Sequence, residues 1–250
     1  MLTHESEAVV LRQYPLSEAD RIVVFFTREY GKVRAVAQGA KRLKSRMGGC
    51  LEPLNHIHLR FYLKEGADLA RVRQCETVYS YLGRSPSLDR VYAFSYLAEL
   101  VQELSQEHYP NQHLFRLFLS VLEAGTKGET GESLIRYFEL WALRLNGLLP
   151  DYDSCSSCGR CVRDEGFFAW LEAGQGRCSS CAGGRGLQVR PAAAQLLYRM
   201  SKVSPQQFAA LPWQALAGRD LERLAQGLLE LHIEKRLKSY TILRDFCRQQ

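Results

Sequence analysis

The sequence predicts an α+β protein in which a small N-terminal β-barrel is followed by a larger helical domain. Residues 6–77 contain short runs of apolar, β-branched and aromatic residues separated by turns, as strands do, and the runs at residues 32–36 and 56–63 alternate with a period of two. From Ser85 onward apolar residues recur every three or four positions, as on the buried face of a helix. A cluster of cysteines interrupts the helical part. We therefore expect two domains, residues 1–80 and 81–250.

Five strands are expected in the first eighty residues. The fourth is the clearest, because apolar residues occupy every second position from Ile57 to Leu63. Five strands with a long excursion between the third and fourth fit a closed OB-type barrel. An SH3-like barrel or a small open sheet fits the pattern nearly as well. The expected strands cover residues 8–11, 21–27, 32–36, 56–63 and 69–78.

The excursion, residues 38–50, is basic and has glycines at both ends, and no acidic residue occurs between Tyr30 and Leu51. Mobile cations of this kind suit a phosphate backbone, although a solvated loop without a partner is the simpler alternative. On the outer face of the fourth strand, Tyr62 or another exposed aromatic residue can stack on a base. The candidate DNA-binding cations are Lys32, Arg34, Lys41, Arg42, Lys44, Arg46 and Arg60.

The helical part has several clear starting signals. Serine and asparagine caps, and prolines directly after a cap, mark the beginnings of helices, and glycines mark their ends. Aromatic and aliphatic stripes at helical spacing predict a packed core. We expect helices that begin at Ser85, Asn111, Ser133, Arg190, Ser204 and Arg219, the last of which runs to about Phe246.

Two Cys-x-x-Cys knuckles lie inside the helical domain, with a short apolar strand between them at residues 166–171. This is the build of a zinc ribbon, which we place at about residues 151–187. Gly159 follows the first knuckle, where a positive φ lets backbone N–H groups turn toward the thiolates. A site of four thiolates has no open position for water, so one structural zinc ion is expected. Its ligands are Cys155, Cys158, Cys178 and Cys181.

A fifth cysteine, Cys161, leaves other assignments open, because Cys158 and Cys161 also have knuckle spacing. The position of Gly159 favours Cys155 and Cys158 and leaves Cys161 as a spare thiol. An iron–sulfur cluster also suits Cys-x-x-Cys-x-x-Cys, but the fourth cysteine of the compact run is absent. Disulfides are disfavoured, because a reducing compartment is expected for this chain.

The composition is that of a protein with a core and no membrane segment. Of 250 residues, 46% are hydrophobic and 24% charged. The acidic start lacks the apolar run of a signal peptide, and no apolar run approaches the ~20 residues of a membrane span. We therefore expect a cytoplasmic protein without membrane contact.

The net charge of +6 is unevenly distributed. Residues 1–80 carry a net charge of +4, residues 81–154 of −4 and residues 155–250 of +6. The basic N- and C-terminal segments suit a surface that binds a polyanion. The acidic segment between them would then face away from the polyanion or toward another protein.

No catalytic motif is found. The glycines form neither a dinucleotide nor a P-loop fingerprint, no Gly-x-Ser-x-Gly occurs, and the six histidines lack metal spacing. A zinc-dependent enzyme is disfavoured, because four thiolates leave no open site. The sequence favours a binding protein over an enzyme.

Several segments spread along the whole chain point to a known family: residues 29–33, 38–45 and 51–53, the paired knuckles, and residues 234–239. Together, these segments resemble the RecO family of bacterial DNA repair proteins. The resemblance implies an OB domain followed by a helical domain with a zinc module. It also implies binding to single- and double-stranded DNA, strand annealing, and a place at the nucleoid in the cytoplasm. Some members lack the cysteines, which supports a structural role for zinc.

The family's partners are RecR and, in some members, RecF. With them it loads RecA onto gaps coated by single-strand binding protein (SSB). We expect no covalent step in the mechanism. The basic loop and the barrel hold one DNA strand by its phosphates and screen its charge, so that a second DNA strand can pair with it. In the alternative, the helical domain is a scaffold that docks the acidic C-terminal tail of SSB or a RecR ring. The cations proposed to rim such a docking pocket are Arg116, Arg136 and Arg199.

Overall fold

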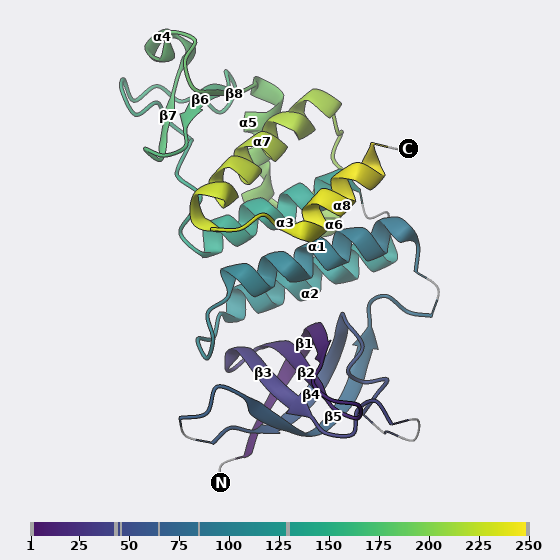
Figure 1. Cartoon of the computed structure of the whole chain (residues 1–250). Helices are drawn as coiled ribbons and strands as arrows, with labels where there is room; N and C mark the ends of the chain where they lie inside the picture. Colours follow the sequence, from purple (N-terminus) through teal and green to yellow (C-terminus); the bar gives the residue numbers. More distant parts are fainter. Residues whose placement is uncertain are drawn as a thin grey trace. The chain divides into compact units, whose positions relative to one another are not determined.

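The computed structural model describes residues 3–42, 45, 47–64, 66–84, 86–128 and 131–248. The chain forms two compact units (Figure 1). Met1–Thr126 and Leu237–Gln250 make up the first, and Lys127–Arg236 the second. The N-terminal barrel belongs to the first unit, and the cysteine cluster to the second. The predicted order, a five-stranded barrel followed by helices, is confirmed.

The barrel strands pair in the order β1-β2-β3-β5-β4, and β4 pairs back with β1. The β3–β5 seam is parallel and contains only two residue pairs, whereas the other neighbours are antiparallel. A barrel held at one seam by so short a ladder matches the partly open OB type. Its strands are β1 (Thr3–Pro15), β2 (Arg21–Thr27), β3 (Gly31–Ala37), β4 (Asn55–Tyr62) and β5 (Ala70–Ser80).

The barrel core follows from the alternation in the sequence. In β4, Ile57, Leu59 and Phe61 are buried, while the residues between them face outward. They meet residues of the other strands, such as Phe25, in one core cluster. Burial of each such side chain stabilises the fold by about 1.5–3 kcal/mol, and it fixes which face of each strand remains outside.

The first strand extends further than its apolar residues predict. An end at Leu11 was expected because proline breaks strands, but β1 continues to Pro15. Pro15 is its last residue and pairs with Arg21, a position where the missing N–H does little harm to the ladder. As a result Arg12 and Tyr14 lie on the strand.

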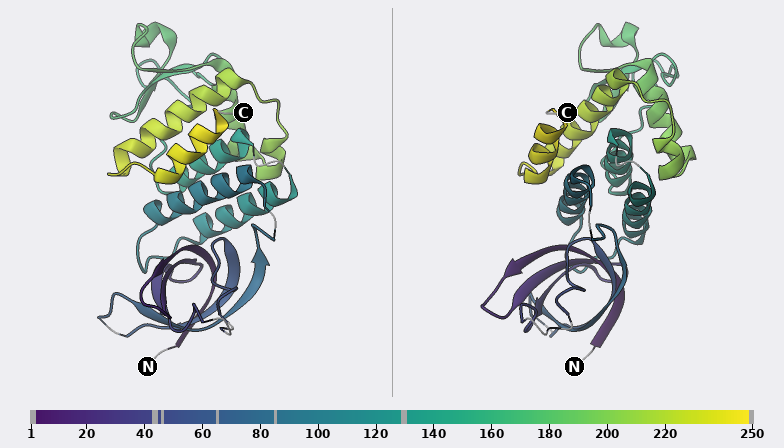
Figure 2. Two further views of the ribbon diagram at one scale, coloured as in Figure 1. Left: turned by 45° about the vertical axis from the view of Figure 1, so that its right-hand side comes forward. Right: turned by 90° about the vertical axis from the view of Figure 1, so that its right-hand side faces the viewer.

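Three helices complete the first unit: α1 (Leu88–Leu104), α2 (Gln112–Lys127) and α8 (Lys238–Cys247). The predicted cap of α2 is confirmed, since the Asn111 side chain accepts a hydrogen bond of 2.9 Å from the Leu114 N–H. The helices α1 and α2 lie side by side next to the barrel (Figure 2). The Phe115 ring of α2 lies 5.7 Å from that of Phe26 on β2. One part of the outer barrel surface is therefore covered.

The connection between α1 and α2 approaches the barrel so closely that it requires a glycine. Gly31 begins β3 with a φ of +63°. A Cβ at this position would lie 2.1 Å from the Tyr109 carbonyl oxygen. Only glycine combines this backbone angle with this approach.

The second unit is built on α3 and α7. Between them Glu139, which is fully buried, lies 3.1 Å from the Arg136 guanidinium and accepts a hydrogen bond of 2.8 Å from Gln226. The helix α6 begins after Ser204 as predicted, and Ser204 forms a capping box with Gln207. The elements are α3 (Glu132–Leu145), β6 (Phe167–Trp170), β7 (Gln175–Arg177), α4 (Ser179–Ala182), β8 (Leu187–Val189), α5 (Pro191–Arg199), the 3₁₀ turn Met200–Lys202, α6 (Pro205–Ala209) and α7 (Ala215–His232).

The prediction of one long last helix was wrong. The segment from Arg219 to Phe246 contains two helices, because α7 ends at His232 and α8 begins at Lys238. Its backbone is extended at Ile233 and Leu237. The Glu99 carboxylate of α1 accepts a hydrogen bond of 2.9 Å from the Ser239 N–H in the first turn of α8. A residue 140 positions away thus helps to set the start of α8.

Among the described residues, no helix is both long enough and apolar enough to cross a membrane.

Candidate metal centre and nucleic-acid interface

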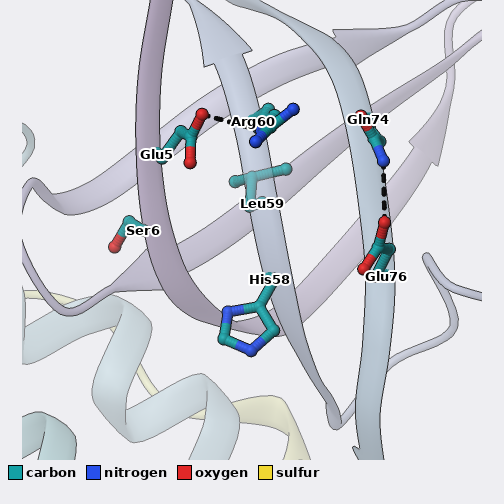
Figure 3. Close-up of a pocket in the computed structure, with 7 residues that line it drawn as sticks. All are labelled: Glu5, Ser6, His58, Leu59, Arg60, Gln74 and Glu76. Carbon is teal, nitrogen blue, oxygen red and sulfur yellow. Dashed lines mark hydrogen bonds and ion pairs between the residues drawn. The ribbon is translucent and has the colours of Figure 1, made fainter.

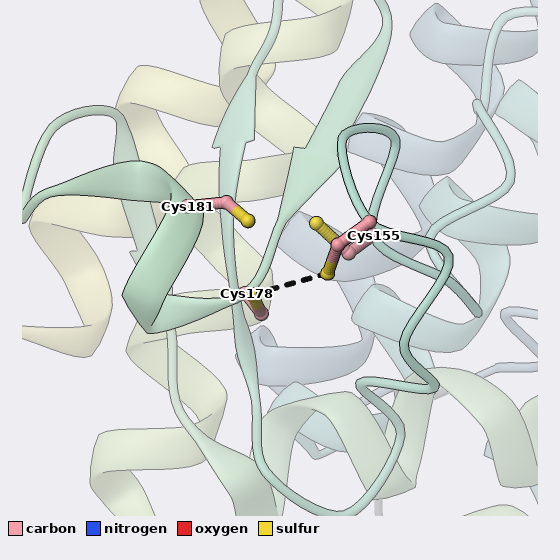
Figure 4. A group of neighbouring side chains, drawn as sticks. Cys155, Cys178 and Cys181 are labelled. Carbon is pink, nitrogen blue, oxygen red and sulfur yellow. Dashed lines mark hydrogen bonds between the residues drawn. The ribbon is translucent and has the colours of Figure 1, made fainter.

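Four cysteines of the second unit converge on one point. The sulfur atoms of Cys155, Cys158, Cys178 and Cys181 all lie within 4.8 Å of one another. Figure 4 shows the side chains of Cys178 and Cys181 directed toward that of Cys155. These are the four predicted ligands. The fifth cysteine, Cys161, is exposed and belongs to a backbone bridge with Ser154.

Local backbone geometry brings the two knuckles together. After the first knuckle Gly159 has a φ of +74°, as predicted, and its N–H bonds to the Cys155 carbonyl. The second knuckle lies on α4, which begins directly after Cys178. The two knuckles are joined through the Ser156 N–H, which donates a hydrogen bond to the carbonyl of Gly176, the middle residue of β7. The small sheet β7-β6-β8 supports both turns.

The thiols differ in acidity because their surroundings differ. Burial raises the pKa of Cys155, but hydrogen bonds from backbone N–H groups, that of Cys178 first, outweigh it and lower the pKa to about 6. The sulfur of Cys178, followed by that of Cys158, raises the pKa of Cys181 to about 12. With its pKa raised this far, Cys181 needs a nearby cation to ionise near neutral pH and act as a thiolate ligand.

The spacing of the sulfurs fits a single ion. A tetrahedral site with metal–sulfur bonds of about 2.3 Å has edges of about 3.8 Å. The sulfurs of Cys158 and Cys178 lie 3.8 Å apart. An iron–sulfur cluster encloses several iron and sulfide atoms, for which sulfurs within 4.8 Å of one another leave too little space. The donor set therefore fits one closed, four-coordinate metal ion.

The first residues of the basic loop, residues 38–50, are hydrogen-bonded to the β1–β2 turn. We call this start of the loop its root. The Lys41 ammonium donates to the Ser17 carbonyl at 2.6 Å, and the Lys41 N–H donates to the Ala19 carbonyl at 3.0 Å. The Gly39 N–H donates to the Asp20 carboxylate at 2.8 Å. Arg42 is exposed. The predicted cations Lys44 and Arg46 lie outside the described residues.

The two predicted cations of β3 already have partners. The Lys32 ammonium donates to the Gln102 carbonyl in the last turn of α1, at 2.9 Å. The Arg34 guanidinium lies 3.0 Å from the Glu107 carboxylate, and both side chains are partly exposed. Lys32 therefore fastens α1 to the barrel, and the charge of Arg34 is partly neutralised.

Arg60 lies among carboxylates. On the outer face of β4 its guanidinium lies 2.7 Å from the Glu5 carboxylate (Figure 3). Both line a shallow pocket of about 260 Å³ that also contains Gln74 and Glu76. Negative charge on this face disfavours a phosphate contact at Arg60, whose role in DNA binding stays a prediction. Tyr62 is half-buried, and the Arg73 guanidinium lies 5.9 Å from its ring centre.

Two exposed residues that the sequence analysis did not select lie beside the loop root. Arg12 and Tyr14 belong to the end of β1, and the Arg12 guanidinium lies 4.8 Å above the Tyr14 ring. The sequence contained a signal for them, because Arg12 and Tyr14 lie at every second position after the buried Leu11, as on the outer face of a strand. Pro15 directly after Tyr14 instead indicated that the strand ends earlier.

Comparison with known proteins covers nearly the whole chain. A family model described as Recombination protein O N terminal matches residues 1–81, and one described as Recombination protein O C terminal matches residues 85–241. The chain belongs to the RecO family. The two RecO models meet close to the predicted domain boundary at residue 80.

Three RecO relatives, each named DNA repair protein RecO, agree in length with the chain. That of Koribacter versatilis (strain Ellin345) is 36% identical over 245 residues, which cover 96% of this chain and 97% of the relative. That of Anaeromyxobacter sp. (strain K) is 34% identical and covers 94% and 93%. That of Geobacter metallireducens is 34% identical and covers 98% of both chains. RecO is thus a family of DNA repair proteins.

The three cations proposed for a RecO partner site are divided between the two units. Arg116 is exposed on α2 of the first unit. Arg136 belongs to the second unit, where only 2% of it is exposed beside Glu139, so it can touch a partner only if its neighbours move. Arg199 is exposed at the end of α5 and lines a pocket of about 190 Å³.

Proposed function

We propose that this chain is a non-enzymatic DNA-binding protein of recombinational repair. It binds single- and double-stranded DNA, anneals complementary strands and, together with RecR and in some settings RecF, helps to load RecA onto DNA coated by SSB. It acts in the cytoplasm, at the nucleoid. Its membership of a DNA repair family carries the proposal, and the basic loop rooted on the barrel supports it.

The proposed mechanism makes and breaks no covalent bond. Lysine and arginine side chains of the loop neutralise phosphates of one strand and release the counterions condensed on it. A second strand then approaches with less repulsion and pairs by its own bases. Contacts to phosphate carry no sequence information, so annealing depends only on the complementarity of the strands.

We propose zinc as the metal, because four thiolates in a closed tetrahedral set are the usual ligands of structural zinc. Cys155, Cys158, Cys178 and Cys181 would hold it. When bound, the ion supplies a cross-link between the two knuckles. An ion pair orients the metal module on the second unit. Arg190 directly follows β8, and its guanidinium lies 2.7 Å from the buried carboxylate of Asp220 on α7.

Strand annealing tests the proposed function directly. Two complementary single strands, one labelled with a donor and the other with an acceptor dye, should anneal faster with the protein present and without any nucleotide cofactor. Added salt should slow this reaction by weakening the phosphate contacts. If the protein binds neither strand and leaves the annealing rate unchanged at every concentration, the proposal is wrong.

The pocket beside Arg199 favours a second candidate, the scaffold that docks the SSB tail. Leu196, Leu211, Pro212 and Ala217 also line this pocket, so an apolar surface lies next to a cation. An acidic tail with an apolar end would match this chemistry. If the SSB tail docks in this pocket of the second unit, contacts of the first unit with RecR or DNA do not depend on it.

Reversal of the charge at Arg199 is expected to weaken binding of an SSB-tail peptide by about 10-fold, equivalent to about 1.4 kcal/mol. DNA affinity should be unchanged in the Arg199→Glu protein. Arg185→Glu provides the control, because Arg185 is equally exposed in the metal module. Fluorescence anisotropy of a labelled peptide measures both variants. Equal peptide affinity in the parent and Arg199→Glu proteins would exclude this pocket.

A further inference from the structure

Three residues form a continuous row on the outer face of the barrel. Tyr14 on β1 pairs with Ile22 on β2, and Ile22 pairs with Val36 on β3. Directly paired residues of antiparallel strands project from the same face. That face is the outer one, because the alternate residues Val23 and Ala35 belong to the barrel core. We call Tyr14, Ile22 and Val36 the Tyr14 row.

Cations border the Tyr14 row on both sides. The adjacent outer row contains Arg12 and, two strands across, Arg34, with Val24 between them in register. Of these two cations Arg34 is paired with Glu107, so Arg12 supplies the charge on this side. On the opposite side lies the β1–β2 turn, to which Lys41 and Gly39 fasten the basic loop. A strand that lies along the Tyr14 row therefore has Arg12 on one side and Lys41 of the basic loop on the other, and both can contact its phosphates.

The Tyr14 row is the open part of a face that is covered elsewhere. Further along β2, Phe26 is fully buried and its ring contacts Phe115 of α2. The Tyr14 row lies beyond this cover: Tyr14 is 36% exposed, and Ile22 and Val36 are half-buried. An aromatic and aliphatic strip that is bordered by cations has the makeup of a stacking platform for single-stranded nucleic acid.

We propose that unpaired bases stack on the Tyr14 row, and that this contact makes the barrel favour single-stranded over double-stranded DNA. The inference rests on the proposed DNA-binding function and assigns its strand selectivity to named residues. The Tyr14 ring and the Arg12 guanidinium stacked on it form a planar surface on which a base can lie. In a duplex the base faces are covered by neighbouring bases, so only its phosphates remain available to the cations.

The test compares Tyr14→Ala with the parent protein on single strands and on duplexes of the same length. Single-strand affinity should fall about 5- to 150-fold, the range that corresponds to about 1–3 kcal/mol for loss of one stacking residue. Duplex affinity and both salt slopes should stay the same, because the phenol ring carries no charge. Tyr14→Phe should retain parent affinity. Tyr109→Ala is the control, since Tyr109 is 68% exposed outside the row.

Other outcomes separate the inference from the function. Unchanged single-strand affinity in Tyr14→Ala, or an equal loss for single strands and duplexes, overturns the inference while the protein remains a DNA-binding protein. A parent protein that binds neither DNA form overturns the proposed function itself. Should Tyr14→Ala fail to fold, photocrosslinking of a 5-iodouracil strand to the parent protein decides. Crosslinks within residues 12–22 support the inference, and crosslinks confined to other segments overturn it.

Discussion

A variant in which alanine replaces Lys41, Arg42, Lys44 and Arg46 is expected to bind single-stranded DNA with a much weaker dependence on salt. The slope of log affinity against log salt should become shallower by about 2.8, because each of the four lost phosphate contacts contributes about 0.7. The four residues follow one another closely in the loop, whose root is fixed at Lys41 and Gly39. Affinity should fall most at low salt. The loss should be similar for all sequences, because phosphate contacts carry no base information.

Stability should hardly change in this variant. Removal of Lys41 loses one exposed hydrogen bond to the Ser17 carbonyl, which contributes about 1 kcal/mol. A control variant that loses four exposed arginines outside the loop tests whether the position of the removed charges matters, because it loses the same total charge. If the loop variant keeps the parent's affinity and slope, or the control loses as much, the loop is not the DNA site. The control replaces Arg84, Arg185, Arg219 and Arg248 by alanine.

Cys178→Ser is expected to release the metal and destabilise the second unit. The parent should contain about one zinc ion per chain, since the four sulfurs form one site. Structural zinc binds with an apparent free energy of about 10 kcal/mol or more in small modules, and that energy also holds the fold together. With three thiolates left, the site should empty in the presence of a chelator. Elemental analysis and thermal unfolding measure both effects.

Cys161→Ser is the matched control for the metal site. Cys161 lies three residues from a ligand but is exposed and outside the group of four sulfurs. This variant should retain its zinc and unfold at the parent temperature. Zinc retained by Cys178→Ser, or lost from Cys161→Ser, would show that the ligands are assigned wrongly.

Features that repeat along the sequence could be predicted from it. The alternation in β4 identifies the buried face, because Ile57 and Phe61 are separated by whole periods of two. The cysteine knuckles could be identified because ligand spacing and the glycine turn are local properties of the chain. Gly159 has the positive φ that its position predicted.

Features that depend on distant residues could not be predicted. Arg34 is paired with Glu107, which lies 73 positions further along the chain, and Arg60 faces Glu5 only through the pairing of β1 with β4. A run of cations without acidic neighbours in sequence is therefore not necessarily unpaired in the fold. The break between α7 and α8 has the same origin, because Glu99 of α1 contributes to it.

The most direct test of the central claim is the affinity of the parent protein for single strands and duplexes over a range of salt concentrations. If the barrel unit binds DNA through phosphates and unpaired bases, log affinity should fall linearly with log salt for both forms. Single strands should bind more tightly at every salt concentration. Affinity that does not respond to salt, or no measurable binding at low salt, would contradict the account.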